Sequence, residues 1–292
     1  MKKNGYLALI AIYTSLTVGC QINPSNNLTK KSCLTSPSAE VTHKKTPTTN
    51  WTEEHIQTAL KSYIYAQMSN NTYGQKGDLY NSDKLDFVLP SDWSFTHFPN
   101  DDIGLAYSIY ERTKNNKLEE VVIAYRGTEG FKSYKDFIYG NFGTKQRIKA
   151  ATIYQAQRDK LNASGLSHVP IILTGHSLGG ALATHTAINL KEDVPYYVFN
   201  TSPRFNKFNW SDVNVEKDIC KRNSIVETGE LLSFFRYPAR EPNQLYTPYN
   251  CNEYYKISSS HGIDKLTRCL VEVAKLSDPT IQIKTVPKVN RD

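Results

Sequence analysis

One serine in this chain stands in a setting that favours nucleophilic chemistry. Ser177 lies between Gly175 and Gly179 in the segment LTGHSLGGALA, after an apolar run and before an alanine-rich one. These two runs predict a buried strand followed by a helix. A sharp strand-to-helix turn needs small neighbours and presents the serine hydroxyl above the sheet in a strained conformation. The helix N-terminus adds N–H groups and a positive dipole, which stabilise an oxyanion.

The general base is predicted by elimination. A serine hydroxyl is activated by a histidine, which an acid orients, and in folds with this turn the chain order is serine, acid, histidine. Only His261, in the loop SSSHGIDKL, satisfies that order. The remaining histidines precede Ser177, adjoin it or lie farther along the predicted helix: His43, His55, His97, His168, His176 and His185.

The acid should follow the strand after YYVFNTSPRF, and the candidate strand lies in RNSIVETGE. Glu230 comes just beyond its end, after Gly229, and Glu227 lies at the end itself. Asp212 and Asp218 are nearer to the preceding loop. We predict Glu230 as the acid, with Glu227 as the second choice.

The elements around these residues alternate between strand and helix. The segments IGLAYSIYER and EEVVIAYRG read as strands joined by a polar turn, and VPIILTG, VPYYVFN and NSIVET as further strands. Helical patterns lie in IKAATIYQAQRDKLNAS, LGGALATHTAINL and GIDKLTRCLVEVAKL. A first helix should begin near Trp51, with Asn50 and Glu53 as its cap. This alternation predicts the α/β class, with a largely parallel sheet covered by helices on both faces.

The N-terminus has the pattern of an export signal. In MKKNGYLALIAIYTSLTVGC, two lysines precede an apolar stretch that ends in small residues. The ending LTVGC resembles a bacterial lipoprotein cleavage box, which makes residues 1–19 the signal peptide and Cys20 the lipidated first residue. An ordinary signal peptide is the alternative. Gln21 in place of an aspartate fits the outer membrane, so we expect a lipid anchor in the bacterial cell envelope, on the periplasmic or the surface face.

Composition divides the remainder of the chain. Residues 20–50 are rich in Ser, Thr, Asn, Lys and Pro without an apolar pattern, which predicts a flexible tether. Residues 51–292 form the predicted catalytic domain. The four cysteines beyond Cys20 predict two disulfides in an exported chain, and their spacing does not suggest a metal site: Cys33, Cys220, Cys251 and Cys269. Sequence does not choose among the three possible pairings.

Charge argues against a nucleic-acid partner. The net charge is +7, and without Lys2 and Lys3 it is 33 − 28 = +5. The chain has no basic block with interleaved aromatic residues. A weak attraction to anionic membrane surfaces is the expected consequence. The sequence makes no prediction of oligomeric state.

Three segments together resemble a known family. AYRGTEG, TGHSLGGALA and FNTSPRF are similar to the landmark segments of the class 3 lipases, the fungal-lipase-like branch of the α/β hydrolases. The resemblance implies an α/β-hydrolase fold and an oxyanion hole formed by Thr128 and the N–H of Leu178. It places the family's lid, or its hinge, at SYKDFIYGNF. A simple alignment puts the family's catalytic aspartate at Ser224, where this chain departs from the pattern.

The residues and the resemblance together predict a serine carboxylester hydrolase that acts on lipid esters, as a lipase or phospholipase, through an acyl-enzyme. No metal or organic cofactor is implied. Two alternatives remain open. One is a catalytically inactive hydrolase fold that serves as a surface binding module. The other is an acyltransferase or thioesterase that uses the same site.

Overall fold

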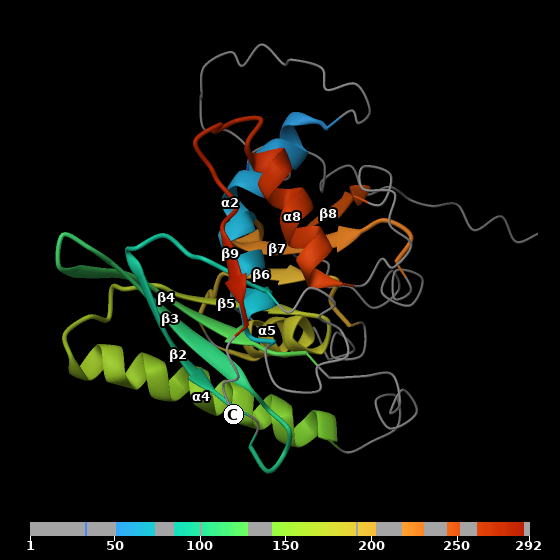
Figure 1. The fold of residues 1–292 in the computed structure, drawn as a ribbon. Helices are drawn as coiled ribbons and strands as arrows, with labels where there is room; N and C mark the ends of the chain where they lie inside the picture. The colour runs from blue at the N-terminus through green and yellow to red at the C-terminus, as the bar shows by residue number, and fades with distance from the viewer. Residues whose placement is uncertain are drawn as a thin grey trace, which may run out of the picture.

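The structure is a computed structural model that describes residue 33 and residues 51–73, 85–99, 101–127, 142–190, 192–202, 218–230, 244–251 and 262–288. Within these residues, a sheet of seven strands in the order β2-β3-β4-β5-β6-β7-β8 forms the centre (Figure 1). Its strands are β2 (Trp93–Phe98), β3 (Tyr107–Lys114), β4 (Lys117–Tyr125), β5 (Ile171–His176), β6 (Tyr196–Phe199), β7 (Arg222–Glu227) and β8 (Leu245–Tyr249).

The strand directions confirm the predicted α/β class. Neighbouring strands from β4 to β8 are parallel, while β2 and β3 are antiparallel to their neighbours. The predicted turn TKNNK joins β3 to β4, with Asn115 and Asn116 at positive φ. Parallel strands need long crossover connections, and helices lie in those from β4 to β5 and from β5 to β6. All parallel strands therefore end at the same edge of the sheet, which we call the carboxyl edge.

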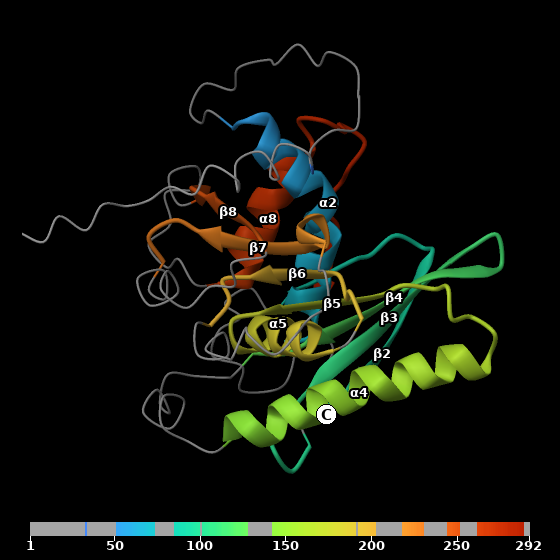
Figure 2. The same cartoon turned by 180° about the vertical axis from the view of Figure 1, so that it is seen from behind.

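Helices cover both faces, as predicted (Figures 1 and 2). The helices are α2 (Glu53–Asn71), α4 (Phe142–Ala163), α5 (Leu178–Asn189) and α8 (Ile263–Ala274). One apolar core joins α2 and α8 to the sheet residues Val122 and Ala124. A second core joins α4 and α5 to Val121 and Ile123 on the other face. Alternate residues of β4 thus enter opposite cores, which is the period-2 pattern of a strand buried on both sides.

The start of α2 differs from the prediction. The N-cap is Thr52. Its hydroxyl accepts a hydrogen bond from the backbone N–H of His55, and the backbone N–H of Thr52 donates to Nδ1 of the His55 ring at 3.3 Å. The prediction of Asn50 with Glu53 was wrong because a histidine, rather than an acid or an amide, completes this capping box. The His55 ring also pairs with the carbonyl of Pro248 at 3.0 Å, so tertiary contact fixes where the helix begins.

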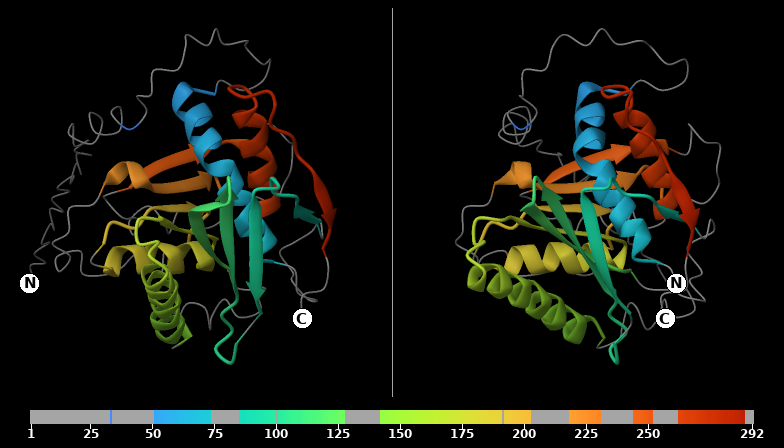
Figure 3. Two further views of the ribbon diagram at one scale, coloured as in Figure 1. Left: turned by 90° about the vertical axis from the view of Figure 1, so that its left-hand side faces the viewer. Right: turned by 60° about the vertical axis from the view of Figure 1, so that its left-hand side comes forward.

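Four strands were not predicted from the sequence. The outer strands β2 and β8 complete the central sheet, and the short strands β1 (Leu85–Phe87) and β9 (Thr285–Pro287) pair antiparallel with each other (Figure 3). The strands β1, β8 and β9 have only three to five residues, which is too short for a reliable pattern. The segment WSFTHF of β2 does alternate at its start, and the prediction overlooked it.

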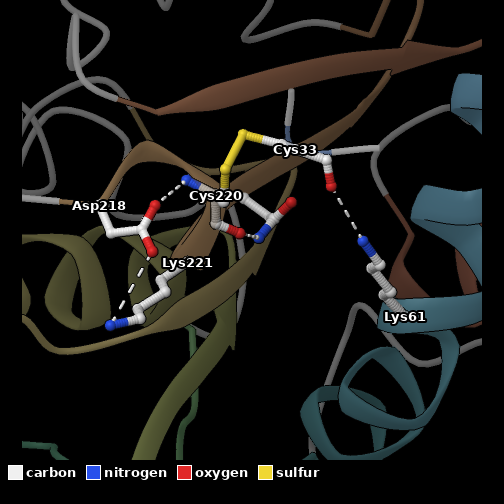
Figure 4. The surroundings of a disulfide bond; sticks show 6 residues. Cys33, Lys61, Asp218, Cys220 and Lys221 are labelled. Atoms are coloured by element: carbon white, nitrogen blue, oxygen red, sulfur yellow. Dashed lines mark hydrogen bonds and ion pairs between the residues drawn. A yellow bond between two sulfur atoms is a disulfide. The ribbon is translucent and has the colours of Figure 1, made fainter. Parts of the chain in front are cut away.

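Two disulfides join described cysteines, which confirms the predicted number. Cys251 pairs with Cys269, linking the end of β8 to α8, and Cys33 pairs with Cys220 beside the start of β7 (Figure 4). The carbonyl of Cys33 also accepts a hydrogen bond from Lys61 Nζ at 3.3 Å. Cys33 lies inside the predicted tether, 33 − 20 = 13 positions after Cys20, so the disulfide to Cys220 attaches the tether to the folded domain at this point. In the part of the chain described, no helix has the length and apolar character to cross a membrane.

Candidate active site

Ser177 lies at a sharp turn between β5 and α5, at the carboxyl edge. Its φ of +55° and ψ of −119° place a non-glycine residue in a strained backbone region. The Ser177 N–H donates to the carbonyl of Phe199 at 3.0 Å, and its own carbonyl accepts the N–H groups of Ala181 and Ser202. Hydrogen bonds from two neighbouring elements therefore hold the strained residue in place. This is the turn that the sequence pattern predicts.

The flanking glycines are required by close backbone approach. A Cβ added to Gly179 would lie 2.0 Å from the carbonyl oxygen of Tyr125, and one added to Gly175 would lie 2.4 Å from the carbonyl carbon of Gly179. Both contacts are with backbone atoms, which have little freedom to move. The glycines let α5 pack directly on the ends of β4 and β5, so the first turn of α5 lies next to Ser177.

The predicted oxyanion hole is partly within the described residues. Leu178 is the first residue of α5, and the N–H groups in the first turn of a helix have no acceptor inside it. This N–H lies at the positive end of the helix dipole, directly after the serine. Thr128, the other predicted donor, lies outside the described residues, as does most of the predicted lid region. The residue before Thr128 is Gly127, which is described and buried.

A buried tyrosine connects Gly127 to the serine turn. The Tyr73 hydroxyl accepts the N–H of Gly127 at 3.0 Å and pairs with Nδ1 of His176, also at 3.0 Å. Tyr73 and His176 are each only 2% exposed, so this pair is shielded from water. A Cβ on Gly127 would lie 2.2 Å from the Tyr73 hydroxyl and 3.4 Å from the Ser177 Cβ. Tyr73 therefore ties the segment that leads to Thr128 to the residue that precedes Ser177.

Tyr73 is itself anchored by the C-terminal segment. Lys288 donates from Nζ to the carbonyl of Tyr73 and, at 3.2 Å, to the carbonyl of Asn70 at the end of α2. The same ammonium lies 3.6 Å from the buried carboxylate of Asp86 in β1. The pairing of β1 with β9 brings Lys288 to this position. Tyr73 and Lys288 were not predicted, because neither lies in a recognisable motif.

Both predicted acids lie buried at the carboxyl edge. Glu227 ends β7 and is 3% exposed, and Glu230 follows the turn at Thr228–Gly229 and is 1% exposed. β7 is separated from β5 by β6, so its backbone lies about 10 Å from that of β5. His261, the predicted base, lies outside the described residues, one position before Gly262 and α8.

Ser224 is the position at which a simple alignment puts the family's aspartate. In the structure it lies inside β7, away from the carboxyl edge of the sheet. It is opposite Val198 of β6 and Tyr246 of β8, and is 2% exposed. An acid at this position would be enclosed by the sheet. Of the two candidate glutamates, Glu227 is the last residue of β7 and Glu230 follows the strand.

Asn200, which was not predicted, connects the ends of β6 and β7. Its side-chain Oδ1 accepts the N–H of Glu227 at 2.7 Å, and its own N–H donates to the carbonyl of Ile225 at 3.0 Å. Asn200 is fully buried and has a φ of +42°, a conformation that asparagine tolerates better than most residues. The sequence signal was an asparagine directly after an apolar strand. Asn200 fixes the strand end that carries Glu227 and leads to Glu230.

Other histidines that the structure describes do not act as a base for Ser177. His55 caps α2, and His97 pairs through Nδ1 with Ser108 at 3.0 Å on β3. His185 lies two turns along α5, where burial and then the positive charge of Arg147 lower its pKa to about 4. His185 is therefore neutral at pH 7 and distant from the serine along the helix. Among the described residues, no cluster of histidine, cysteine, aspartate or glutamate could hold a metal ion.

The sheet order, the serine at its strained turn and the helices on both faces define an α/β hydrolase of the lipase type. The sequence model of the Tle-like phospholipase domain matches residues 60–205. This match covers 205 − 60 + 1 = 146 of the 292 residues. The chain therefore belongs to the Tle-like phospholipase domain family, and the predicted α/β-hydrolase resemblance is confirmed.

The chain is also similar to solved lipase structures at low sequence identity. A lipase from Rhizopus microsporus var. chinensis is 14% identical, with 78% of this chain and 86% of that chain covered at a TM-score of 0.43. The Rhizomucor miehei lipase in its propeptide complex is 11% identical, with 71% and 75% covered at 0.40. A mono- and diacylglycerol lipase from Aspergillus oryzae is 15% identical, with 53% and 76% covered at 0.35. A search of curated protein sequences found no match.

Proposed function

We propose that this protein is a serine carboxylester hydrolase that cleaves acyl esters of phospholipids or related glycerolipids. One observation carries the proposal: Ser177 occupies a strained turn between a buried strand and a helix N-terminus. Such a turn costs free energy and persists only where the surrounding contacts impose it, which is common at catalytic nucleophiles. Membership of a phospholipase domain family supports a lipid ester as the substrate.

The proposed reaction proceeds through an acyl-enzyme. The Ser177 hydroxyl oxygen attacks the ester carbonyl carbon while His261 accepts its proton. The resulting oxyanion is bound by the Leu178 N–H and by Thr128, and each such donor typically contributes on the order of 3 kcal/mol. The C–O bond to the alcohol breaks as His261 returns the proton to it. Water, deprotonated by the same imidazole, then attacks the acyl carbon and releases the fatty acid and Ser177.

We propose Glu230 rather than Glu227 as the acid that orients His261. The N–H of Glu227 is held by Asn200, and this residue is still part of the strand. Glu230 lies beyond the turn, where the chain leaves the sheet and a side chain can reach toward a neighbouring loop. Burial of a carboxylate is costly unless it is paired or hydrogen-bonded, so a carboxylate that is 1% exposed fits a partner such as an imidazolium.

We further propose that the mature chain is anchored through acyl groups on Cys20 in the bacterial cell envelope. The support is the sequence pattern of residues 1–20. Metabolic labelling with a radioactive fatty acid should mark the wild-type protein and leave Cys20→Ser unlabelled. Equal labelling of the two proteins would contradict the anchor.

The test of function is fatty-acid release from a panel of phospholipids, diacylglycerols and p-nitrophenyl esters. Ser177→Ala should abolish release, whereas Ser164→Ala should retain it, because Ser164 lies beyond the far end of α4. If the wild-type protein is folded and hydrolyses none of the panel, the proposal is wrong and a surface binding module becomes the better account. Transfer of the acyl group to an added alcohol in preference to water would instead indicate an acyltransferase.

A further inference from the structure

We propose that the exposed N-terminal part of α4 docks on an anionic phospholipid surface. This docking brings the carboxyl edge of the sheet, where Ser177 lies, to the lipid. The docking surface consists of the exposed residues Lys145, Ile148 and Lys149, and we call it the basic face of α4. This inference deepens the proposed function, because it rests on a lipid substrate for the same site. It adds a place of attachment and a preference for negatively charged lipid.

The basic face of α4 lies at the same edge of the sheet as Ser177. The helix connects β4 to the parallel strand β5, so it runs opposite to both strands and begins at the carboxyl edge. Figures 1 and 2 show α4 alongside α5, the helix that begins at Ser177. A flat surface that contacts the first turns of α4 would therefore meet the edge from which the serine is reached.

The burial pattern separates this face from the packed side of the helix. Gln146, Ala150 and Ile153 are buried, and Gln146 donates to the carbonyl of Ile103 at 2.9 Å. Lys145 and Lys149 are exposed, and Ile148 between them is 64% exposed. Among the described residues, Val88, Phe95 and Val286 are also large, apolar and exposed, each less than Ile148. An apolar side chain flanked by two lysines is the arrangement that a membrane interface accommodates.

The charges at the start of α4 oppose the helix dipole. Acids favour the first turn of a helix, and α2 has Glu53 and Glu54 there while α8 has Asp264. The first turn of α4 has no acidic residue, and its first two turns contain Lys145, Arg147 and Lys149. Lys145 in the first turn lies near the positive end of the helix dipole, which is unfavourable for the isolated helix. A bound anionic surface would compensate this cost.

Among the described residues, two acids lie in the loop that packs against the start of α4. The loop that Gln146 contacts carries Asp101 and Asp102. The Asp101 carboxylate accepts the N–H groups of Ile103 and Leu105, and Asp102 is exposed. The guanidinium of Arg147 donates to the hydroxyl of Thr144 at 2.9 Å. No ion pair neutralises Lys145 or Lys149 among the described residues, so both ammonium groups are available to lipid phosphates.

A bilayer fits these features better than a polyanion. Lysine side chains extend around an apolar residue and place their ammonium groups at the phosphate level, while the apolar residue enters the interface. Nucleic-acid surfaces favour aromatic and arginine-rich contacts over an exposed isoleucine. The substrate class proposed for Ser177 also resides in a bilayer. We therefore commit to an anionic phospholipid surface as the partner.

The test measures binding without turnover. The protein begins at Gln21, which keeps every described element and both disulfides, and it carries Ser177→Ala so that lipid is not consumed. Co-sedimentation is measured with vesicles of phosphatidylcholine alone and of phosphatidylcholine mixed equally with phosphatidylglycerol. The test variant is Lys145→Glu with Lys149→Glu. The matched control is Lys114→Glu with Lys117→Glu, which makes the same charge change where β3 ends and β4 begins, at the opposite edge.

We expect binding to the mixed vesicles and much weaker binding to phosphatidylcholine. The test variant should lower the partition coefficient on mixed vesicles by roughly tenfold or more, and the control should change it little. Ile148→Ser should weaken binding, unlike Val286→Ser on β9. Thermal unfolding verifies that each variant is folded. The expected contrast supports docking even if the wild-type protein hydrolyses no ester, in which case the proposed function alone fails.

Three results would overturn the proposal. The first is equal loss in the test and control variants, because that would reflect net charge and not this face. The second is unchanged binding of Lys145→Glu with Lys149→Glu. The third is binding to heparin or DNA that depends on the two lysines, with no binding to mixed vesicles, which would identify a polyanion as the partner.

Discussion

The Tyr73 hydroxyl holds two groups on which the geometry of the serine turn depends. Tyr73→Phe would leave the N–H of Gly127 and Nδ1 of His176 buried without this partner. We expect a stability loss of about 1–3 kcal/mol. We also expect kcat to fall by roughly tenfold or more with little change in KM, because the oxyanion segment loses its position.

The control for this prediction is Tyr110→Phe. Tyr110 is fully buried, and its hydroxyl donates to the carbonyl of Met68 at 3.3 Å, away from the serine turn. Steady-state kinetics and urea denaturation of both variants distinguish an effect on the position of the oxyanion segment from an effect on the free energy of unfolding. If Tyr110→Phe lowers kcat as much as Tyr73→Phe does, Tyr73 has only a structural role.

The two buried glutamates differ in their expected effect on catalysis. Glu230→Gln should lower kcat by roughly 10²–10⁴ because the imidazole of His261 loses the anion that orients it. Glu227→Gln should have a much smaller effect, since the Asn200 contact is with the Glu227 backbone. Initial rates on one soluble ester, for both variants, give the comparison. A larger loss for Glu227→Gln would exchange the two assignments.

His185 should make the protein sensitive to acid. Burial, followed by the charge of Arg147, lowers its pKa to about 4 in the folded state from the ordinary 6.5. Between pH 6.5 and 4 the unfolded chain binds a proton that the folded chain does not, so this contribution to stability is complete above pH 6.5 and is lost as the pH falls. Since His185 is only half-buried, we expect a loss of roughly 1 kcal/mol across that interval.

Replacement of His185 by glutamine should reduce the acid sensitivity. Denaturant midpoints for wild type, His185→Gln and His168→Gln at several pH values test this, because His168 is exposed. The His185 variant should lose less stability on acidification than the other two proteins. Identical pH dependence in all three would show that His185 does not contribute.

Among the helices and strands, α5 approaches β4 so closely at Gly179 that no side chain fits between them. Gly179→Ala would place a Cβ 2.0 Å from the backbone oxygen of Tyr125, so α5 must shift away from the sheet. We expect a destabilisation on the order of 3 kcal/mol or more, with loss of activity. Gly165→Ala is the control, since its Cβ meets nothing within 4 Å and only the φ of +71° opposes it, at about 1–2 kcal/mol. Chemical denaturation should therefore give a much lower free energy of unfolding for Gly179→Ala than for Gly165→Ala. The reverse order would contradict the packing argument.

The sequence predicted the elements whose burial pattern is local. Long apolar runs marked β4 and β5, and the glycine spacing marked the turn at Ser177, because each pattern arises from neighbouring residues. The pair β1 and β9 was missed because each strand has only three residues and its partner is about 200 positions away. The outer strand β2 pairs with the adjacent β3, and its alternating start was overlooked. The cap at Thr52 was misassigned since the His55 ring gains its position partly from Pro248.

The residues of the candidate site also divide into those that the sequence predicted and those that it missed. Ser177, Leu178 and the two glutamates follow from motif and chain order, since they lie at the ends of recognisable strands. Tyr73 and Asn200 could not be predicted, because their contacts join residues up to 103 positions apart. Sequence also could not choose the disulfide pairing, which depends on the folded chain bringing Cys33 to Cys220.

Over the whole molecule, the two disulfides should differ in their effect on catalysis. The Cys251–Cys269 bond closes a segment that contains His261, and both cysteines are buried. Replacing both by alanine should cost about 3 kcal/mol by the loop-closure account and should lower activity. The Cys33–Cys220 bond attaches the N-terminal segment near the start of β7, at the opposite edge from Ser177.

The matched variant Cys33→Ser with Cys220→Ser should therefore retain the specific activity on a soluble ester. Activity and melting temperature are measured for both double variants. The two double variants could instead lose equal activity. In that case both disulfides affect activity through the stability of the fold, and the loss without Cys251–Cys269 does not come from a displaced His261.

The central claim, that Ser177 is the nucleophile of an ester hydrolase, is tested most directly by covalent labelling. The wild-type protein is treated with a fluorophosphonate, and the modified residue is located by peptide mass spectrometry. We predict one adduct, on Ser177, that forms in parallel with the loss of esterase activity and that is absent when the protein is first unfolded. A folded protein that gains no adduct, or an adduct on another serine, would contradict the account.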